Sequence, residues 1–540
     1  MDNIVLIGFM GCGKTEISKI LSRRLGLKTV DTDSIIVKKA GMQIPEIFEK
    51  YGENYFRKIE ELAVKEASKK KNRIIATGGG IVKNRRNIDI LKKSGKIVFL
   101  KNSFETSEKR LKGKTDRPLF KDKKKARALL KERAPLYEAA ADIIVKTDKL
   151  TKNRAAEAVI AGLGDLKKRK KIRVRAGEKP YDIYIGSGII GDTGELLKNR
   201  APGKKVLVVS NRKVFGYYGE KVLRGLKKYF EVFVCLLPDG EKHKTLKSAE
   251  KVYDACAKNG LDRYSTIVAL GGGVIGDTAG FAAATYMRGI GLVHVPTTVI
   301  AQVDSSIGGK TGVDTKAGKN LVGAFYQPDF VISDILALKT LSDTEFKNGL
   351  AEVIKHGIIM DAPYFYFLKK NHDAIKQRKP RVLIKVIERS ARLKSAVVEK
   401  DEKEKTGLRA ALNYGHTIGH AIEAAAGYKR YKHGQAVVLG MAAAASMAYH
   451  KKICSKQTVE LQIQMFNLFN LIKPLKNIKT GSILKRLYND KKVKNGKIRF
   501  ILTKKIGCVT FIKNVSLTTI KNCLKRLKNL EKGKEEVLYG

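Results

Sequence analysis

The 540-residue sequence has no tryptophan, and its six cysteines lie far apart without a CxxC pair. This spacing argues against a disulfide framework and against a thiolate zinc site. No apolar run reaches the length of a bilayer span, and the N-terminus lacks the basic segment and cleavage site of a secretory signal. We therefore expect reduced thiols, no membrane partner and a cytoplasmic location.

Acidic residues are scarce, since 53 aspartates and glutamates stand against 108 lysines and arginines and the formal net charge is +55. An excess of this size fits either a nucleic-acid partner or a lysine-rich solvated surface. The basic residues are spread along the chain, and no RNA-binding signature is present. The sequence therefore predicts weak, salt-sensitive adhesion, no specific nucleic-acid function, and attraction of anionic substrates.

The length predicts at least two domains, since one hydrophobic core usually serves about 100 to 200 residues. Short apolar strands alternate with helical segments, which is typical of an α/β fold with a parallel sheet and crossover helices. A glycine and basic run interrupts the alternation, and helical periodicity dominates after about residue 335. The predicted parts are an N-terminal α/β domain (1–163), a basic linker (164–171), a second α/β part (172–335) and a mainly helical part (336–540).

A complete GxxxxGKT phosphate loop spans residues 8–15, between an apolar strand and a helix. Backbone amides of such a loop surround phosphate oxygens, its lysine reaches the transferring phosphate, and its threonine holds Mg²⁺. The predicted ATP contacts here are Gly11, Cys12, Gly13, Lys14 and Thr15. The loop identifies ATP as the phosphate donor but leaves the acceptor open.

The segments that follow make the first part resemble shikimate kinase over nearly its whole length. They are residues 31–33, 55–60, 78–80, 115–119 and 132–137. The resemblance implies that Asp31 helps to position Mg²⁺ and that Asp33 binds the acceptor hydroxyls, although this aspartate pair also fits a helix cap. The implied shikimate contacts are Asp33, Arg57, Gly78, Gly79, Gly80 and Arg133.

The resemblance also implies a mobile lid whose Arg117 closes on ATP, and an adenine stacked on Arg110. Glu16 departs from the family pattern, which usually has Ser or Thr after the loop threonine, so we expect slightly weaker ATP binding. Another small-metabolite kinase of the same fold is the alternative, but such kinases lack the paired acceptor arginines.

A second glycine motif, GxGxxG, follows an apolar strand at residues 266–270 and is typical of a dinucleotide pyrophosphate site. His416 and His420 are four residues apart on a predicted helix, so their rings face one side, and His433 follows. With Glu352 as a further donor, this pattern indicates a metal site. A histidine pair at a helix start without a metal is the alternative.

Residues 286–289, 295–298 and 302–310 closely resemble 3-dehydroquinate synthase, and the resemblance runs from about Lys171 to the C-terminus. It implies NAD and a catalytic Zn²⁺, or Co²⁺ in its place, with coordination positions open for substrate hydroxyls. The implied metal ligands are Glu352, His416 and His433, whereas His420 is implied at the substrate. The implied NAD contacts are Asp239, Glu241, Lys242, Gly271, Gly272, Gly273, Val274, Gly276, Asp277, Thr297, Thr298, Lys310, Lys319, Lys339 and Thr340.

The family's substrate, 3-deoxy-arabino-heptulosonate 7-phosphate, carries a carboxylate and a phosphate, which require basic contacts. The implied contacts are Asp304, Lys310, Lys319, Asn320, Lys355, Lys394, Arg409 and Asn413. Exposed lysines are common in so basic a chain, so we place more weight on those within tight motifs. Across both parts, the residues expected to act in catalysis are Lys14, Asp33, Arg117, Lys310, Lys355, Arg409 and His420.

The implied second reaction oxidises the substrate transiently, eliminates phosphate, reduces the product and closes a ring, without net NADH. Gln435 departs from the family's usual Glu, so metal affinity falls if that carboxylate tunes His433. A metal-dependent alcohol dehydrogenase of related architecture is the alternative and would accumulate NADH. A homodimer through this part is compatible with the sequence.

Overall fold

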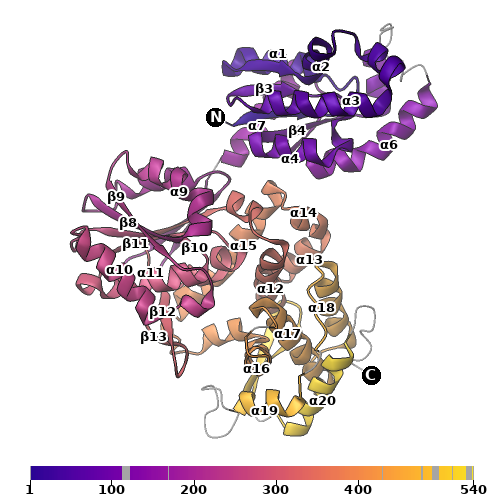
Figure 1. Cartoon of the computed structure of the whole chain (residues 1–540). Helices are drawn as coiled ribbons and strands as arrows, with labels where there is room; N and C mark the ends of the chain where they lie inside the picture. Colours follow the sequence, from indigo (N-terminus) through magenta and orange to yellow (C-terminus); the bar gives the residue numbers. More distant parts are fainter. Residues whose placement is uncertain are drawn as a thin grey trace. The chain divides into compact units, whose positions relative to one another are not determined.

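The computed structural model of the chain describes residues 2–111, 122–167, 169–428, 430–475, 478–488, 498–513, 515–530 and 538. The chain divides into two compact units, Met1–Lys167 and Lys168–Gly540 (Figure 1). Among the described helices, none combines the length and the apolar character needed to cross a bilayer.

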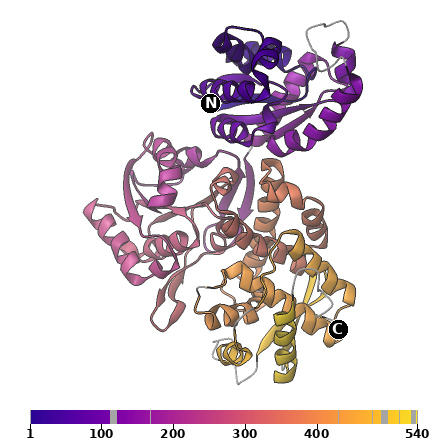
Figure 2. The same cartoon turned by 45° about the vertical axis from the view of Figure 1, so that its right-hand side comes forward.

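The first unit is built on a parallel sheet of five strands in the order β2-β3-β1-β4-β5. Helices cover both faces (Figure 2), which explains why every residue of its central strand is buried. α1 and α7 pack on one face, and α3, α4 and α6 pack on the other. The bounds are β1 Asn3–Ile7, α1 Lys14–Leu25, β2 Lys28–Asp31, α2 Thr32–Ala40, α3 Ile44–Ser68, β3 Arg73–Ala76, α4 Arg85–Ser94, β4 Gly95–Lys101, α5 Phe104–Leu111, α6 Lys123–Ala140, β5 Ile143–Lys146 and α7 Lys152–Lys167.

The predicted linker at residues 164–171 is longer than the break that the structure has. α7 continues to Lys167, and the next strand, β6 (Lys170–Val174), begins at Lys170. A glycine within a helix costs only about 1 kcal/mol relative to alanine. Packing of Ala155, Ala156 and Val159 against the sheet anchors the preceding turns of α7.

The second unit begins with a seven-stranded sheet in the order β6-β7-β14-β11-β10-β8-β9, in which only β6 runs antiparallel to its neighbour. α8 and α9 pack on one face, and α10 and α11 pack on the other. A hairpin of β12 and β13 follows β11. The bounds are β7 Tyr181–Gly186, α8 Thr193–Leu197, β8 Lys205–Asn211, α9 Arg212–Leu226, β9 Glu231–Leu237, α10 Leu246–Lys258, β10 Thr266–Gly271, α11 Gly273–Thr285, β11 Gly291–Pro296, β12 Lys310–Thr315, β13 Gly318–Phe325 and β14 Phe330–Asp334.

The remainder of the second unit is mainly helical and has one large core. Helical periodicity did not reveal the antiparallel pair β15–β16, because residues 500–503 are all buried and show no alternation. The bounds are α12 Asp343–Met360, α13 Ala362–Lys370, α14 His372–Lys376, α15 Pro380–Lys400, η8 Leu408–Asn413, α16 His416–Ala425, α17 His433–His450, α18 Lys456–Leu468, α19 Thr480–Tyr488, β15 Arg499–Lys505, β16 Cys508–Lys513 and α20 Leu517–Asn529.

Candidate active sites

The phosphate loop joins β1 to α1, and Lys14 is the first residue of the helix. Its Nζ donates to the carbonyls of Gly8 and Phe9 at 2.7 and 3.1 Å, so the ammonium lies over its own loop. Gly11 and Gly13 have φ angles of 77° and 95°, which favour glycine and shape the loop. The loop thus directs a helix N-terminus and an ammonium toward one anion site.

Arg110 and Glu16 lie beside this loop. Arg110 donates to the carbonyls of Cys12 and Thr147 at 3.4 and 2.8 Å. The Glu16 carboxylate pairs with Lys152 at 3.1 Å and with Lys19 at 3.5 Å, and these lysines hold its pKa below the usual range. The negative charge that we expected to weaken ATP binding is therefore balanced locally.

The acceptor side of this site depends on the glycines that follow β3. A Cβ at Gly78 would lie 2.6 Å from the Asp33 carboxylate, and a Cβ at Gly80 would lie 2.8 Å from the Arg57 guanidinium. Glycine therefore allows both side chains to approach this turn. Arg133 is buried and donates to the Gly79 carbonyl at 3.3 Å. Its Nε has no hydrogen-bond partner among the described residues, so it can still donate to an anion.

Asp31, Arg117 and Arg57 are three further predicted residues of the first unit, and their outcomes differ. Asp31 is the N-cap of α2 and accepts a bond from the Asp33 amide at 2.9 Å, so the helix-cap interpretation holds for one of its oxygens. Arg117 and the predicted lid lie outside the described residues. Arg57 is held by Glu53 and the buried Glu60, each at 2.9 Å.

The GxGxxG turn connects β10 to α11, as the dinucleotide motif predicts. A Cβ at Gly272 would lie 3.1 Å from Thr298, and a Cβ at Gly273 would lie 3.2 Å from Ser305. Because these two glycines have no side chains, the turn leaves a cradle of the kind that admits a pyrophosphate. The helix N-terminus at Gly273 adds backbone donors to this cradle.

Lys244 is a residue of this region that sequence reasoning missed. It is buried and contacts Asp277 and, at 2.5 Å, the Asn320 side chain, whereas the predicted Lys242 is exposed. Burial opposes charge on Lys244, but nearby Asp277 raises the pKa of its ammonium above the ordinary value. The sequence shows only a run of basic residues at 242–244. The structure is needed to identify Lys244 as the buried residue of this run.

Other predicted dinucleotide contacts lie on surrounding segments. Asp239 accepts a bond from Asn211 at 3.1 Å, and Glu241 pairs with Lys319 at 3.3 Å. Thr340 lies 2.5 Å from the hydroxyl of Tyr218 on α9. The remaining predicted positions are Gly271 at the end of β10, Val274 and Gly276 in α11, Thr297 after β11, and Lys339 at the end of a short 3-10 helix.

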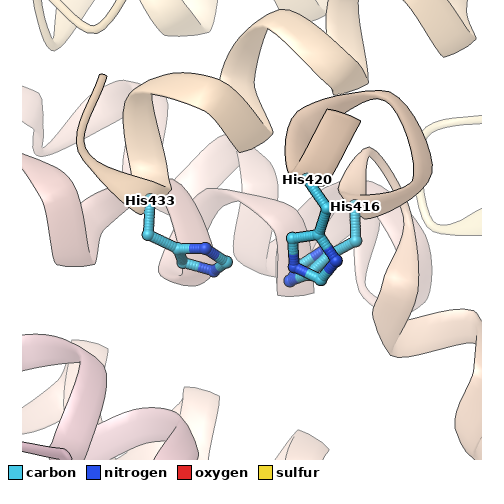
Figure 3. A group of neighbouring side chains, drawn as sticks. All are labelled: His416, His420 and His433. Carbon is cyan, nitrogen blue, oxygen red and sulfur yellow. The ribbon is translucent and has the colours of Figure 1, made fainter. Parts of the chain in front are cut away.

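Three histidines form a cluster where α16 meets α17 (Figure 3). His416 and His420 come from α16 and His433 begins α17, and each offers a nitrogen within 4.8 Å of the others. Oε1 of Glu352, on α12, lies 3.6 Å from His416 Nε2 and 3.7 Å from His433 Nε2. The carboxylate and the two imidazoles that the sequence predicted as ligands therefore surround one point.

Close helix packing brings these ligands together. A Cβ at Gly434 would lie 2.1 Å from the backbone oxygen of Asn348, so only glycine lets the start of α17 contact α12. A Cβ at Gly440 would lie 1.9 Å from the backbone oxygen of Gly415, directly before α16. These two contacts hold all three helices at distances that larger residues would prevent.

The charges at this point favour a cation. Glu352 is buried; its Oε2 contacts the Lys355 ammonium, whereas its Oε1 has no hydrogen-bond partner among the described residues. Burial opposes ionisation, but Lys355 and His416 hold the pKa of Glu352 well below its usual range. Glu352 and Glu423 raise the pKa of His433 to about 10 against the effect of burial. A buried anion facing two imidazoles is a donor set that fits a divalent zinc or cobalt ion.

Outer partners orient both imidazoles. His416 Nδ1 lies 3.1 Å from the carbonyl of Tyr414, and His433 Nδ1 lies 3.2 Å from Glu423 Oε2. Sequence reasoning missed Glu423, although its spacing from His416 and His420 places it on the same helix face. Gln435, whose departure we expected to matter, instead accepts a bond from the Lys432 amide at 3.1 Å and caps α17.

We therefore predict that Glu423→Gln weakens zinc binding by about 10- to 100-fold, because the carboxylate orients His433 and increases its basicity. Gln435→Glu, by contrast, leaves zinc affinity unchanged within about threefold, because this side chain contacts backbone instead of His433. Chelator competition on the two purified variants measures both affinities. Equal loss in both would show that the partner of His433 is misassigned.

The predicted substrate residues contact several segments of the second unit. Lys394 donates to the backbone and side chain of Asp304, and Lys355 contacts Glu352. Lys310 pairs at 2.5 Å with Glu404, an acidic residue that sequence reasoning missed. Arg409 is buried and lies 3.5 Å from the same carboxylate, and Asn413 ends η8. Lys355 thus adjoins the carboxylate that faces the histidines, whereas Lys310 and Arg409 meet at Glu404.

Comparison with protein families matches three parts of the chain. Residues 10–163 match the shikimate kinase model, residues 234–348 the 3-dehydroquinate synthase N-terminal model and residues 349–493 the C-terminal model of the same enzyme. A 3-dehydroquinate synthase of Nostoc punctiforme is 47% identical over 357 residues, which cover 65% of this chain and 98% of that protein.

Two solved structures resemble the second unit. A 2-deoxy-scyllo-inosose synthase complexed with carbaglucose-6-phosphate, NAD⁺ and Co²⁺ is 27% identical, with a TM-score of 0.62, and covers 67% of this chain and 100% of its own. The 2-epi-5-epi-valiolone synthase of Streptomyces hygroscopicus, with NAD⁺ and Zn²⁺ bound, is 27% identical, with a TM-score of 0.61, over 66% of this chain and 99% of its own. The chain carries a shikimate kinase domain at its N-terminus and belongs, over the remainder, to the 3-dehydroquinate synthase family.

Proposed function

We propose that the chain is a bifunctional enzyme of the shikimate pathway. The first unit phosphorylates shikimate with ATP and Mg²⁺ to give shikimate 3-phosphate. The second converts 3-deoxy-arabino-heptulosonate 7-phosphate to 3-dehydroquinate and phosphate, with NAD and a divalent metal. The observation that carries the second activity is the buried Glu352 carboxylate facing two imidazoles at 3.6 and 3.7 Å, beside a family match that spans this region.

In the first unit, we assign the phosphate donor, ATP, to the phosphate loop and the phosphate acceptor, shikimate, to the glycine turn after β3. Lys14 and the α1 N-terminus bind the transferring phosphate, because an ammonium and backbone amides match its charge. Asp33 accepts the proton of the attacking hydroxyl, and Arg57 and Arg133 orient the shikimate carboxylate. Support comes from the glycine turn, where only glycine leaves space for Asp33 and Arg57.

In the second unit, Glu352, His416 and His433 would hold the metal, and the cradle at Gly272 and Gly273 would hold NAD. When bound, NAD accepts and returns a hydride, and the metal polarises the substrate hydroxyls. Side chains of the protein bind the substrate's charges and move its protons. We assign its anionic groups to Lys310 and Arg409, which converge on Glu404, and proton transfer to His420.

Two assays on one preparation test this proposal. Shikimate should stimulate ATP consumption, and the heptulosonate phosphate should release phosphate without net NADH. A metal-dependent alcohol dehydrogenase would accumulate NADH instead, and another small-metabolite kinase would prefer a different acceptor. Phosphate release should also stop after chelation and return with zinc, because a three-ligand catalytic site leaves its metal accessible.

We further propose a cytoplasmic location and the absence of a specific nucleic-acid partner. The basic residues are distributed along the chain, which supports salt-sensitive adhesion over a defined nucleic-acid site. A homodimer through the second unit is compatible with this activity. Binding to nucleic acid that persists at physiological salt would contradict the proposal.

A further inference from the structure

His356 has no part in the ligand set or the substrate contacts assigned above. It lies on α12 one turn after Glu352, its exposed fraction is 0%, and neither ring nitrogen has a hydrogen-bond partner among the described residues. Leaving a buried polar group unpaired costs about 1–3 kcal/mol, so proteins rarely do so. The imidazole should therefore bond to a group other than one of the described side chains.

The surroundings of His356 define where this group sits. One ligand atom each from Asp304, Glu352 and His356 lies within 4.8 Å of the other two. Three atoms with this spacing can all be reached from one point that is at most about 2.8 Å from each, which is a normal hydrogen-bond length. The spacing of the three atoms therefore allows one small polar group to contact all three side chains.

Charge identifies this group as neutral. Lys355 pairs with Glu352 and Lys394 pairs with Asp304, so an ammonium group lies beside each of the two carboxylates. A second divalent cation here would lie beside both ammonium groups and be repelled. A water molecule has no such conflict, because it can donate to both carboxylates and accept from the N–H of a neutral imidazole. Three such bonds are typical of a buried water.

We propose that His356 is a positioning residue, which anchors one buried water between Asp304 and Glu352. The water links Glu352, the proposed metal ligand on α12, to Asp304, the proposed substrate contact that precedes β12. Oε1 of Glu352 faces the histidines and Oε2 contacts Lys355, so a water bonded to this carboxylate adds a further contact that fixes the angle at which Oε1 meets a metal. This inference rests on the proposed zinc site but assigns a role to a residue outside it.

Zinc affinity tests the proposal independently of turnover. We expect His356→Phe, which removes both ring nitrogens, to weaken zinc binding by about 10-fold or more, as loss of an outer partner does elsewhere. His356→Asn and His356→Gln place a polar atom near one or the other nitrogen. At least one of them should keep zinc affinity within about threefold of the wild type. Chelator competition on the full chain measures all four proteins.

His294→Phe is the matched control, because His294 is also buried but lies on β11, against Gly276. Its zinc affinity should equal that of the wild type. Wild-type zinc affinity in His356→Phe, or an equal loss in all three His356 variants, would overturn the role of the hydrogen bond. A crystal structure of the zinc-loaded chain should show a water at this point, and an anomalous metal peak there would contradict it. A wild-type chain that binds no zinc would refute the proposed function itself.

Discussion

Lys14→Ala is expected to abolish shikimate phosphorylation and leave phosphate release by the second unit unchanged. Lys14 is the ammonium over the phosphate loop, and groups that stabilise developing charge are commonly worth about 10²- to 10³-fold in kcat. The second activity should survive because the chain forms two compact units, each with its own hydrophobic clusters. Parallel assays of ATP consumption and phosphate release measure both outcomes.

Lys65→Ala provides the control for removing a lysine from the same unit. Lys65 is exposed and pairs with the partly exposed Glu61, and such surface pairs contribute about 0–1 kcal/mol. Both activities should therefore remain close to wild type in this variant. Loss of both activities in Lys14→Ala would reject the independence of the two units, and retention of kinase activity would reject the assignment of Lys14.

His416→Ala is expected to remove bound zinc and stop phosphate release, while shikimate phosphorylation continues. The proposed site has only three protein ligands, and one carboxylate with one imidazole holds zinc far more weakly. Elemental analysis of the purified variant should find well below one zinc per chain, against nearly one in the wild type. The kinase assay on the same sample shows whether the first unit remains folded.

His372→Ala is the matched control for loss of a histidine from the helical part. His372 begins α14, apart from the histidine cluster, and its ring lies 3.0 Å from a backbone carbonyl. It should keep both its zinc and its lyase activity. Zinc retained in His416→Ala would show that the metal has a different ligand set, for example one that includes His420.

Local sequence patterns predicted most of the fold and the main motifs of both sites. The phosphate loop and the GxGxxG turn were readable because their function depends on contiguous backbone, and each lies where a strand meets a helix. Spacing also placed His416 and His420 on one helix face. The β15–β16 pair was missed because its buried segment shows no alternation.

Partners that come from distant segments could not be predicted in this way. Glu404 was not assigned, because its pairing with Lys310 spans 94 residues of sequence. Gln435 illustrates the converse, since its place beside His433 in the sequence suggested a contact, whereas its side chain caps the helix. Proximity in sequence and proximity in space differ most for side chains that leave a helix in different directions.

The sequence alone determined which chemical groups this protein has and which short turns present them: a phosphate loop, a dinucleotide turn, and histidines with helical spacing. Only the tertiary structure decided that Glu352 faces two of those histidines, that Glu423 orients one of them, and that His356 is buried without a partner among the side chains that the structure describes. The reason is physical. A turn is specified by the backbone preferences of adjacent residues, whereas a buried charge acquires its partners from helix packing, which depends on glycine contacts far apart in the chain.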